Sequence, residues 1–129
     1  MQSEMSYTVE TGKSFDEAVE AVEAKTRERG FRVLHVHDVQ ATLAEKGLQR
    51  EPLKIIEICN AKYAHQVLEK DDLISLLMPC KIVVYRKDGK TILSAMRPTM
   101  LAQFFPAAHL DDVAKEVDAI VLGIVDAAK

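Results

Sequence analysis

The segment Lys87-Asp88-Gly89-Lys90 constrains the fold of this 129-residue chain more than any other feature of its sequence. Runs of β-type composition flank it on both sides, Lys81 to Arg86 and Thr91 to Met96. Asp-Gly between two such runs predicts a tight hairpin, because both central positions of the turn tolerate positive φ. The two runs are therefore expected to be neighbouring antiparallel strands.

The N-terminal part of the chain alternates between strand and helix patterns. A short strand is expected over Met5 to Thr11, and a helix begins at Ser14. Ser14 and Glu17 have the spacing of a capping box, in which both side chains satisfy otherwise unpaired backbone donors. Gly30 predicts the left-handed end of this helix, and the next strand follows over Phe31 to His37. Strict alternation would place four of its side chains on one face, those of Phe31, Val33, His35 and His37.

The middle of the chain contains the strand that is expected to be most central, Leu53 to Cys59. It is apolar on both faces, which predicts that it is covered on both sides. Asp38 is expected to cap a short helix before this strand, which runs to Lys46. Asn60 is a good N-cap for the helix that follows the strand.

The C-terminal part predicts a loop or short helical turn and then a long helix from about His109 to the end. The order of elements is therefore βαβαβαββα. This order predicts an α+β fold, with a single mixed or antiparallel sheet of about five strands and helices packed on it. We expect one domain over residues 1–129, with residues 1–5 as a loose N-terminal extension.

Composition excludes several classes of function. The 17 Lys and Arg residues against 20 Asp and Glu give a net charge of -3, so no nucleic-acid partner is expected. The longest strongly apolar stretch is too short for a membrane span, and no secretory signal is evident, so the expected location is cytoplasmic. Motifs for phosphate loops, serine hydrolases and zinc proteases are absent, and no cofactor is expected.

The two cysteines, Cys59 and Cys80, each lie where a predicted strand meets a loop. If the two strands are antiparallel neighbours, the thiols converge; if the strands are parallel, the thiols lie at opposite ends of the sheet. Cys59 also precedes a predicted helix N-terminus, whose partial positive charge lowers the pKa of a nearby thiol. The alternative is that both are small buried apolar residues, which is common for free cysteine.

Four features of the chain together resemble the domain-of-unknown-function 302 family: the Cys59-Asn60 dyad, the helix after it with Ala64 and Leu68, Pro79-Cys80 before a hairpin, and the segment from Asp38 through Leu43 to Lys46-Gly47. The resemblance runs from about Ser6 to the C-terminal helix. It implies a small α+β domain that forms a homodimer, and it implies no particular reaction. Ala61 stands where the family commonly has Pro, and Met78 where it commonly has Leu.

Other side chains are candidates with simpler alternatives. Glu57 lies two residues before Cys59 on a buried strand, so it is either an acid-base group or the partner of Arg97 or Lys81; we favour the ion pair. Tyr63 and Tyr85 are candidates for orienting a ligand.

Histidines are further candidates, as metal ligands. His35 and His37 share the spacing of two ligands on one strand face, but no matching group completes a zinc site, so no metal is expected. A site that joins His65 to Cys59 and Cys80 is conceivable.

We therefore expect a protein that binds a small ligand or partner in a cleft near Cys59, Asn60 and Cys80, with Tyr63 and Tyr85 as further ligand contacts. Asn60 would cap its helix and present an amide to the ligand, while the thiols line the floor. One alternative is a thiol-dependent redox or metal-assisted enzyme, in which Cys59 and Cys80 would be the catalytic candidates together with Glu57.

A second alternative is a structural or assembly protein that acts through its homodimer surface. Gly123 within the apolar C-terminal helix and the loop with Phe104 and Phe105 would then face the partner subunit.

Overall fold

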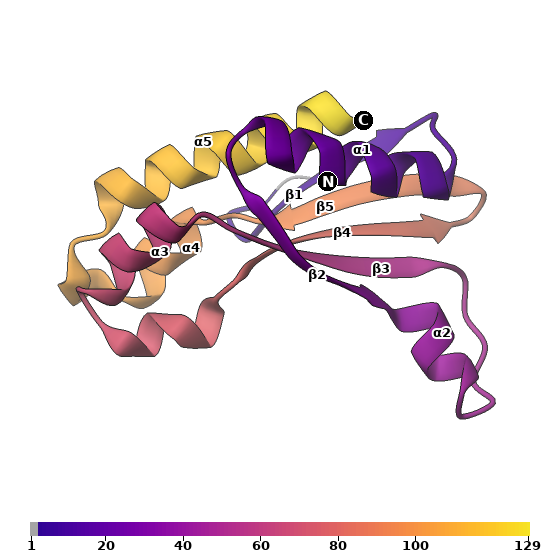
Figure 1. Cartoon of the computed structure of the whole chain (residues 1–129), viewed down its shortest axis with the longest axis horizontal. Coiled ribbons are helices and arrows are strands. Elements are labelled where there is room, and N and C mark those ends of the chain that lie inside the picture. Colours follow the sequence, from indigo (N-terminus) through magenta and orange to yellow (C-terminus); the bar gives the residue numbers. More distant parts are fainter. Residues whose placement is uncertain (1–2) are drawn as a thin grey trace.

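A five-stranded antiparallel sheet, in the order β1-β5-β4-β3-β2, organises the computed structural model, which describes residues 3–129 (Figure 1). The strands are β1 (Ser6–Thr11), β2 (Arg32–Asp38), β3 (Leu53–Cys59), β4 (Cys80–Lys87) and β5 (Lys90–Met96). The predicted α+β fold is confirmed, and the sheet is antiparallel throughout rather than mixed.

The predicted hairpin joins β4 to β5. Asp88 and Gly89 have φ angles of 51° and 77°, and Lys87 pairs with Lys90. Both central residues of the turn thus lie in the left-handed region, as the Asp-Gly sequence predicts. The hairpin fixes the register of the two strands at the centre of the sheet.

Two long helices, α1 (Phe15–Glu28) and α5 (Asp111–Ala128), cover one face of the sheet (Figure 1). The capping box of Ser14 and Glu17 is present, and Gly30 ends the first helix with φ 77°. The two helices bury the apolar side chains that β3, β4 and β5 direct toward them: Ile56, Ile58, Ile82, Val84, Leu93 and Ala95. This helix-covered face holds the main core.

The opposite face of the sheet is open in Figure 1, between α2 (Val39–Ala44) at one end and the 3₁₀ turn η1 (Asp72–Leu77) at the other. The prediction that Leu53 to Cys59 is covered on both sides is therefore wrong for the single chain. Helices cover its Ile56 and Ile58 side, whereas Ile55 faces away from them. Its apolar outward side is an open surface of this chain.

Strand β2 departs from the predicted alternation. Its pairing with β3 shifts register between Val33 and His35, so Val33 and Val36 both pack against the core. His35 and His37 remain exposed on the other side. The physical reason is a β-bulge, in which an extra residue lets one strand change the face of its side chains. The predicted grouping of Phe31 and Val33 with the two histidines is therefore wrong.

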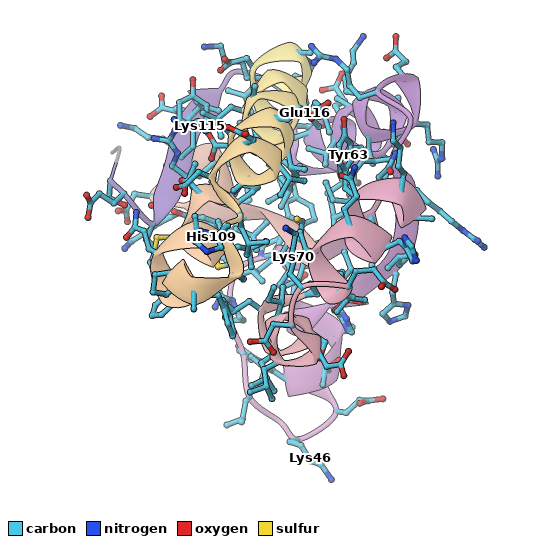
Figure 2. The ribbon with its side chains drawn as sticks, turned by 90° about the vertical axis from the view of Figure 1, so that its left-hand side faces the viewer. Lys46, Tyr63, Lys70, His109, Lys115 and Glu116 are labelled. Atoms are coloured by element: carbon cyan, nitrogen blue, oxygen red, sulfur yellow. The ribbon has the colours of Figure 1, made fainter. Side chains whose placement is uncertain are left out.

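A second, smaller apolar cluster lies at the end of the sheet where β3 finishes and β4 begins. Helix α3 (Ala61–Leu68), η1, α4 (Thr99–Phe104), the turn η2 (Pro106–Ala108) and the start of α5 close this end. Their buried side chains are Val67, Ile74, Leu101 and Leu110. Figure 2 looks onto this end, with Tyr63 and Glu116 side by side.

The ion pair of Arg97 and Asp118 ties the end of β5 to α5, with 2.8 Å between Nη2 and Oδ2. The backbone carbonyl of Met5 also accepts a 2.7 Å hydrogen bond from the Arg97 amide, while residues 1–2 of the predicted loose extension lie outside the described residues. Among the described helices, none is long and apolar enough to cross a membrane.

Candidate functional site

A small cavity lies between the end of β3, helix α3 and the start of β4. Its volume is about 40 Å³, and 12 residues line it: Phe31, Ile58, Cys59, Asn60, Tyr63, Ala64, Val67, Met78, Pro79, Cys80, Leu101 and Val117. Most of these side chains are apolar. The cavity therefore joins the main core to the smaller cluster, and both predicted cysteines border it.

The neighbouring strand ends bring Cys59 and Cys80 to this one cavity. Strands β3 and β4 are antiparallel, and Cys80 pairs with Ile58, the residue just before Cys59. This arrangement meets the condition under which the two thiols were expected to converge. Both cysteines are free and half-buried.

Burial dominates the protonation of both thiols. It raises the pKa of Cys59 above the ordinary thiol value, and it raises the pKa of Cys80 to about 11. A negative charge on Cys59 would raise the pKa of Cys80 further, whereas the Lys81 ammonium lowers it. The expected lowering of the Cys59 pKa by the helix N-terminus is therefore wrong, because desolvation of the thiolate outweighs the helix dipole.

Asn60 caps α3, as predicted, and also ties the helix to the turn after α1. Its Oδ1 accepts a hydrogen bond from the Tyr63 amide at 3.2 Å, and its Nδ2 donates to the Gly30 carbonyl at 3.1 Å. The Tyr63 hydroxyl donates to Glu116 at 2.7 Å, which raises the pKa of Tyr63. The polar groups of both residues are thus already engaged within the chain.

Glu57 does not share the cavity. Its carboxylate lies 3.3 Å from His37 Nε2, so it forms the ion-pair type of contact that was favoured over catalysis, but with a different partner. The predicted partners are used elsewhere: Arg97 pairs with Asp118, and Lys81 donates to the Pro79 carbonyl at 3.1 Å. The bulge in β2 explains the difference, because it turns His37 toward the Glu57 side of the sheet.

Tyr85 and His65 also lie apart from the cavity. Tyr85 pairs with Leu53 and Ile92 near the hairpin end of β4, five residues beyond Cys80. His65 is exposed and contacts Glu69 at 3.3 Å on the same helix. The conceivable site of His65 with both cysteines is therefore not formed, and the structure gives Tyr85 no contact with this cavity.

The described residues contain no group of three or more His, Cys, Asp or Glu side chains that could hold a metal ion. His35 and His37 contact each other edge to face, with 4.3 Å between ring centroids. They are exposed neighbours on an edge strand.

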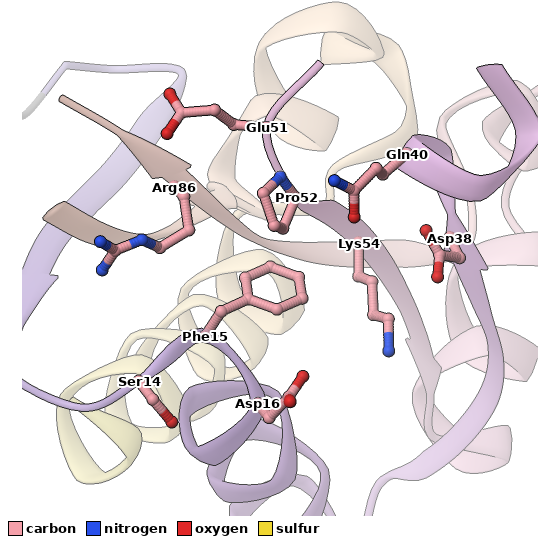
Figure 3. Close-up of a pocket in the computed structure, with 9 residues that line it drawn as sticks. All are labelled: Ser14, Phe15, Asp16, Asp38, Gln40, Glu51, Pro52, Lys54 and Arg86. Carbon is pink, nitrogen blue, oxygen red and sulfur yellow. The ribbon is translucent and has the colours of Figure 1, made fainter. Parts of the chain in front are cut away.

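Sequence reasoning missed a larger hollow at the hairpin end of the sheet (Figure 3). It measures about 620 Å³ and is lined by the start of α1 and the facing ends of β2, β3 and β4: Ser14, Phe15, Asp16, Asp38, Gln40, Glu51, Pro52, Lys54 and Arg86. No local sequence motif predicts this hollow, because its lining residues come from four separate segments. Only the pairing order of the strands could have brought them together.

Comparison with known proteins identifies the family of the chain and supports its fold. The family model described as domain of unknown function DUF302 matches residues 7–128. The crystal structure of an uncharacterized conserved DUF302 protein from Bacillus stearothermophilus is similar to this chain, at 32% sequence identity and a TM-score of 0.91. The match covers 97% of this chain and 98% of that one. No curated protein matches the chain.

Proposed function

Because the chain belongs to the DUF302 family, whose description assigns no activity, we propose from its own geometry that it is a binding protein whose ligand occupies the cavity beside Cys59, Asn60 and Cys80. The observation that carries this proposal is the meeting of both cysteines at one small, mainly apolar space. Core packing normally leaves few voids larger than a water molecule. A void beside both cysteines therefore indicates a place where a ligand can bind.

The size and lining of the cavity restrict the ligand. At about 40 Å³ it is far below the roughly 300–1,000 Å³ of ordinary metabolite pockets. Apolar side chains from β3, α3, α4 and α5, such as Ile58, Val67, Leu101 and Val117, form most of its wall. The ligand is therefore a species of one or a few atoms that tolerates apolar surroundings.

Xenon, which is monatomic and apolar, tests whether the cavity accepts a ligand. We expect xenon pressure to shift the amide and methyl signals of Val67 and Leu101 in two-dimensional NMR spectra. Ala64→Leu, which adds bulk at the cavity wall, should remove these shifts. Ala61→Leu, an exposed change in the same helix, should leave them intact. Saturating xenon without any selective shift at these residues would contradict the proposal.

Chemistry at the thiols is supported less well than binding. A redox enzyme needs a thiolate as the nucleophile, and the raised pKa values keep both thiols protonated near neutral pH. The cavity wall also offers no histidine or free carboxylate that could act as general base.

The open face of the sheet favours a second function, assembly with another copy of this chain. Six apolar side chains of the three central strands point to this face: Leu53, Ile55, Val83, Tyr85, Ile92 and Met96. A solvated face of an antiparallel sheet is normally polar, so this composition indicates a covered surface.

The charges on this open face favour a second copy as its partner. Glu57 and Lys81 lie opposite each other on β3 and β4, so the face carries both signs of charge, and a two-fold-related copy can pair them. Of the surface that was predicted from the C-terminal helix and the loop with Phe104 and Phe105, the Phe104 side chain is exposed, whereas the helix packs within the chain. Gly123 lies against the Arg29 guanidinium, and the apolar stripe of α5 packs in the core.

Sedimentation velocity at increasing protein concentration tests the assembly proposal. We expect a dimer for the wild-type chain and a monomer for Val83→Lys, which places a charge in the middle of the open face. Gln66→Lys, on the exposed side of α3, is the matched control and should remain a dimer. A wild-type monomer at high concentration would remove this second function.

A further inference from the structure

Among the described side chains that line the cavity, those that contain sulfur have donor atoms without a hydrogen-bond partner. Besides Cys59 and Cys80, Met78 belongs to its wall, next to Pro79. The other polar side chains of the wall are those of Asn60 and Tyr63, and both are tied to partners within the chain. Three sulfur-bearing residues from two adjoining strand ends therefore meet at one small space.

This donor set selects a narrow class of ligand. Hard cations such as Mg²⁺ and Ca²⁺ need several oxygen ligands, which the cavity does not offer. Zinc sites have three or four nitrogen, sulfur or oxygen ligands, and the described residues hold no such group of His, Cys, Asp and Glu. Thiolate and thioether together prefer Cu(I), a soft ion that accepts few ligands.

We propose that the occupant of the cavity is a soft monovalent cation of the Cu(I) type, bound by the thiolates of Cys59 and Cys80 with the Met78 thioether as a third donor. This inference rests on the proposed binding function and names the ligand class for the same cavity. A single ion also agrees with the volume of about 40 Å³, which excludes a chelated or organic ligand.

Binding of the ion changes both the protonation and the net charge of the site. Thiols ordinarily carry their protons near neutral pH. Binding of one monovalent ion forms two metal–sulfur bonds and releases two protons to solvent, with no change of oxidation state. The site then carries one net negative charge, which the Lys81 ammonium beside Cys80 partly offsets. Binding is therefore expected to tighten as the pH rises.

Transfer of Cu(I) from a coloured chelator under anaerobic conditions tests this proposal. We expect the wild-type chain to withdraw one Cu(I) per chain from an excess of bicinchoninate, with release of two protons per ion in a weakly buffered solution. Cys80→Ser and Cys59→Ser should each abolish the transfer. Met78→Leu should weaken it without a change in stoichiometry, while Met96→Leu, on the open sheet face, should have no effect.

Circular dichroism of each variant separates loss of the site from loss of the fold, and the wild-type stoichiometry and proton count need no variant at all. A chain that takes no Cu(I), or that keeps its full affinity in Cys59→Ser, overturns the proposal. One ion per two chains, bridging one cysteine from each, also overturns it. If xenon still shifts Val67 and Leu101 while Cu(I) is not withdrawn, the cavity binds a ligand but the ligand is not a soft cation.

Discussion

The two ends of the sheet form different kinds of space. At the cysteine end, α3, η1 and α4 close around β3 and β4 and leave about 40 Å³ lined by apolar and sulfur-bearing side chains. At the hairpin end, about 620 Å³ stays open between strand ends and the start of α1 (Figure 3). The larger space is not the better candidate site, because charged side chains of both signs line it and it is open to solvent.

The polar side chains of the hairpin-end hollow also have structural roles already. Asp38 accepts from the Ala41 amide as the cap of α2, and Arg86 donates to the Thr91 hydroxyl at 2.9 Å. The Lys54 ammonium lies 5.9 Å from the centre of the Phe15 ring. The cysteine end differs in its mainly apolar lining and in its three sulfur-bearing side chains, which are not engaged in this way.

The largest expected effect is the loss of packing at the cysteine end. Ile58→Ala removes a fully buried side chain that both lines the cavity and belongs to the main core. We expect it to lower the free energy of unfolding by about 2–5 kcal/mol, because the loss of apolar contacts and the enlarged void both destabilise the folded state. Urea unfolding monitored by circular dichroism measures this change.

Lys54→Ala in the hairpin-end hollow is the matched comparison, on the same strand. Its side chain is half-buried beside an open space, so the expected loss is about 0.5 kcal/mol. Equal losses of unfolding free energy at the two positions would show that the two ends of the sheet do not differ in packing.

The second-largest expected effect is a loss of stability at high pH, caused by Cys80 at the cysteine end. The pKa of Cys80 is about 11 in the folded chain, against 9.0 for an unperturbed thiol. Between these values the unfolded chain loses the Cys80 proton while the folded chain keeps it, so stability falls as the pH rises. A shift of this size corresponds to about 2–3 kcal/mol, fully present below pH 9 and lost above pH 11.

The measurement is the difference in unfolding free energy between the wild-type chain and Cys80→Ala at several pH values. The difference isolates Cys80, because Tyr7 and Tyr63 also have raised pKa values and titrate in both proteins. A difference that stays constant from pH 8 to 11.5 would mean that Cys80 is not desolvated.

Local sequence patterns predicted the elements of the fold well. The capping box at Ser14, the Asp88-Gly89 turn and the Asn60 cap all depend on side chains within a few residues of one another. Their chemistry acts over one turn of chain, so the sequence contains nearly all the information that they need. The same is true of the apolar stripe of the last helix.

Features that depend on the pairing of distant segments were predicted less well. The bulge in β2 moved His37 to the Glu57 side and gave that carboxylate a partner that alternation did not suggest. The cavity itself was predicted only conditionally, since the meeting of Cys59 with Cys80 required β3 and β4 to be antiparallel neighbours. Met78 was not recognised as a wall residue, because a methionine before Pro-Cys has no local signature.

The smallest expected difference in unfolding free energy is between variants of the two helix caps, one at each end of the sheet. Asn60→Ala removes the cap of α3 and also the 3.1 Å bond to the Gly30 carbonyl, whereas Asp38→Ala removes the cap bond of the exposed helix α2. We expect losses of about 1–2 kcal/mol for Asn60 and about 0.5–1 kcal/mol for Asp38, measured by urea unfolding.

The two caps also differ in their expected effect on ligand uptake. Asn60→Ala frees the turn at the start of α3, so the xenon-induced shifts at Val67 should become weaker or broader. Asp38→Ala should leave those shifts unchanged, because α2 lies at the far end of the sheet from α3 (Figure 1). If Asn60→Ala loses stability while the xenon shifts keep their full size, Asn60 supports the fold without shaping the cavity. The ligand would then depend on the sulfur-bearing residues and the apolar wall alone.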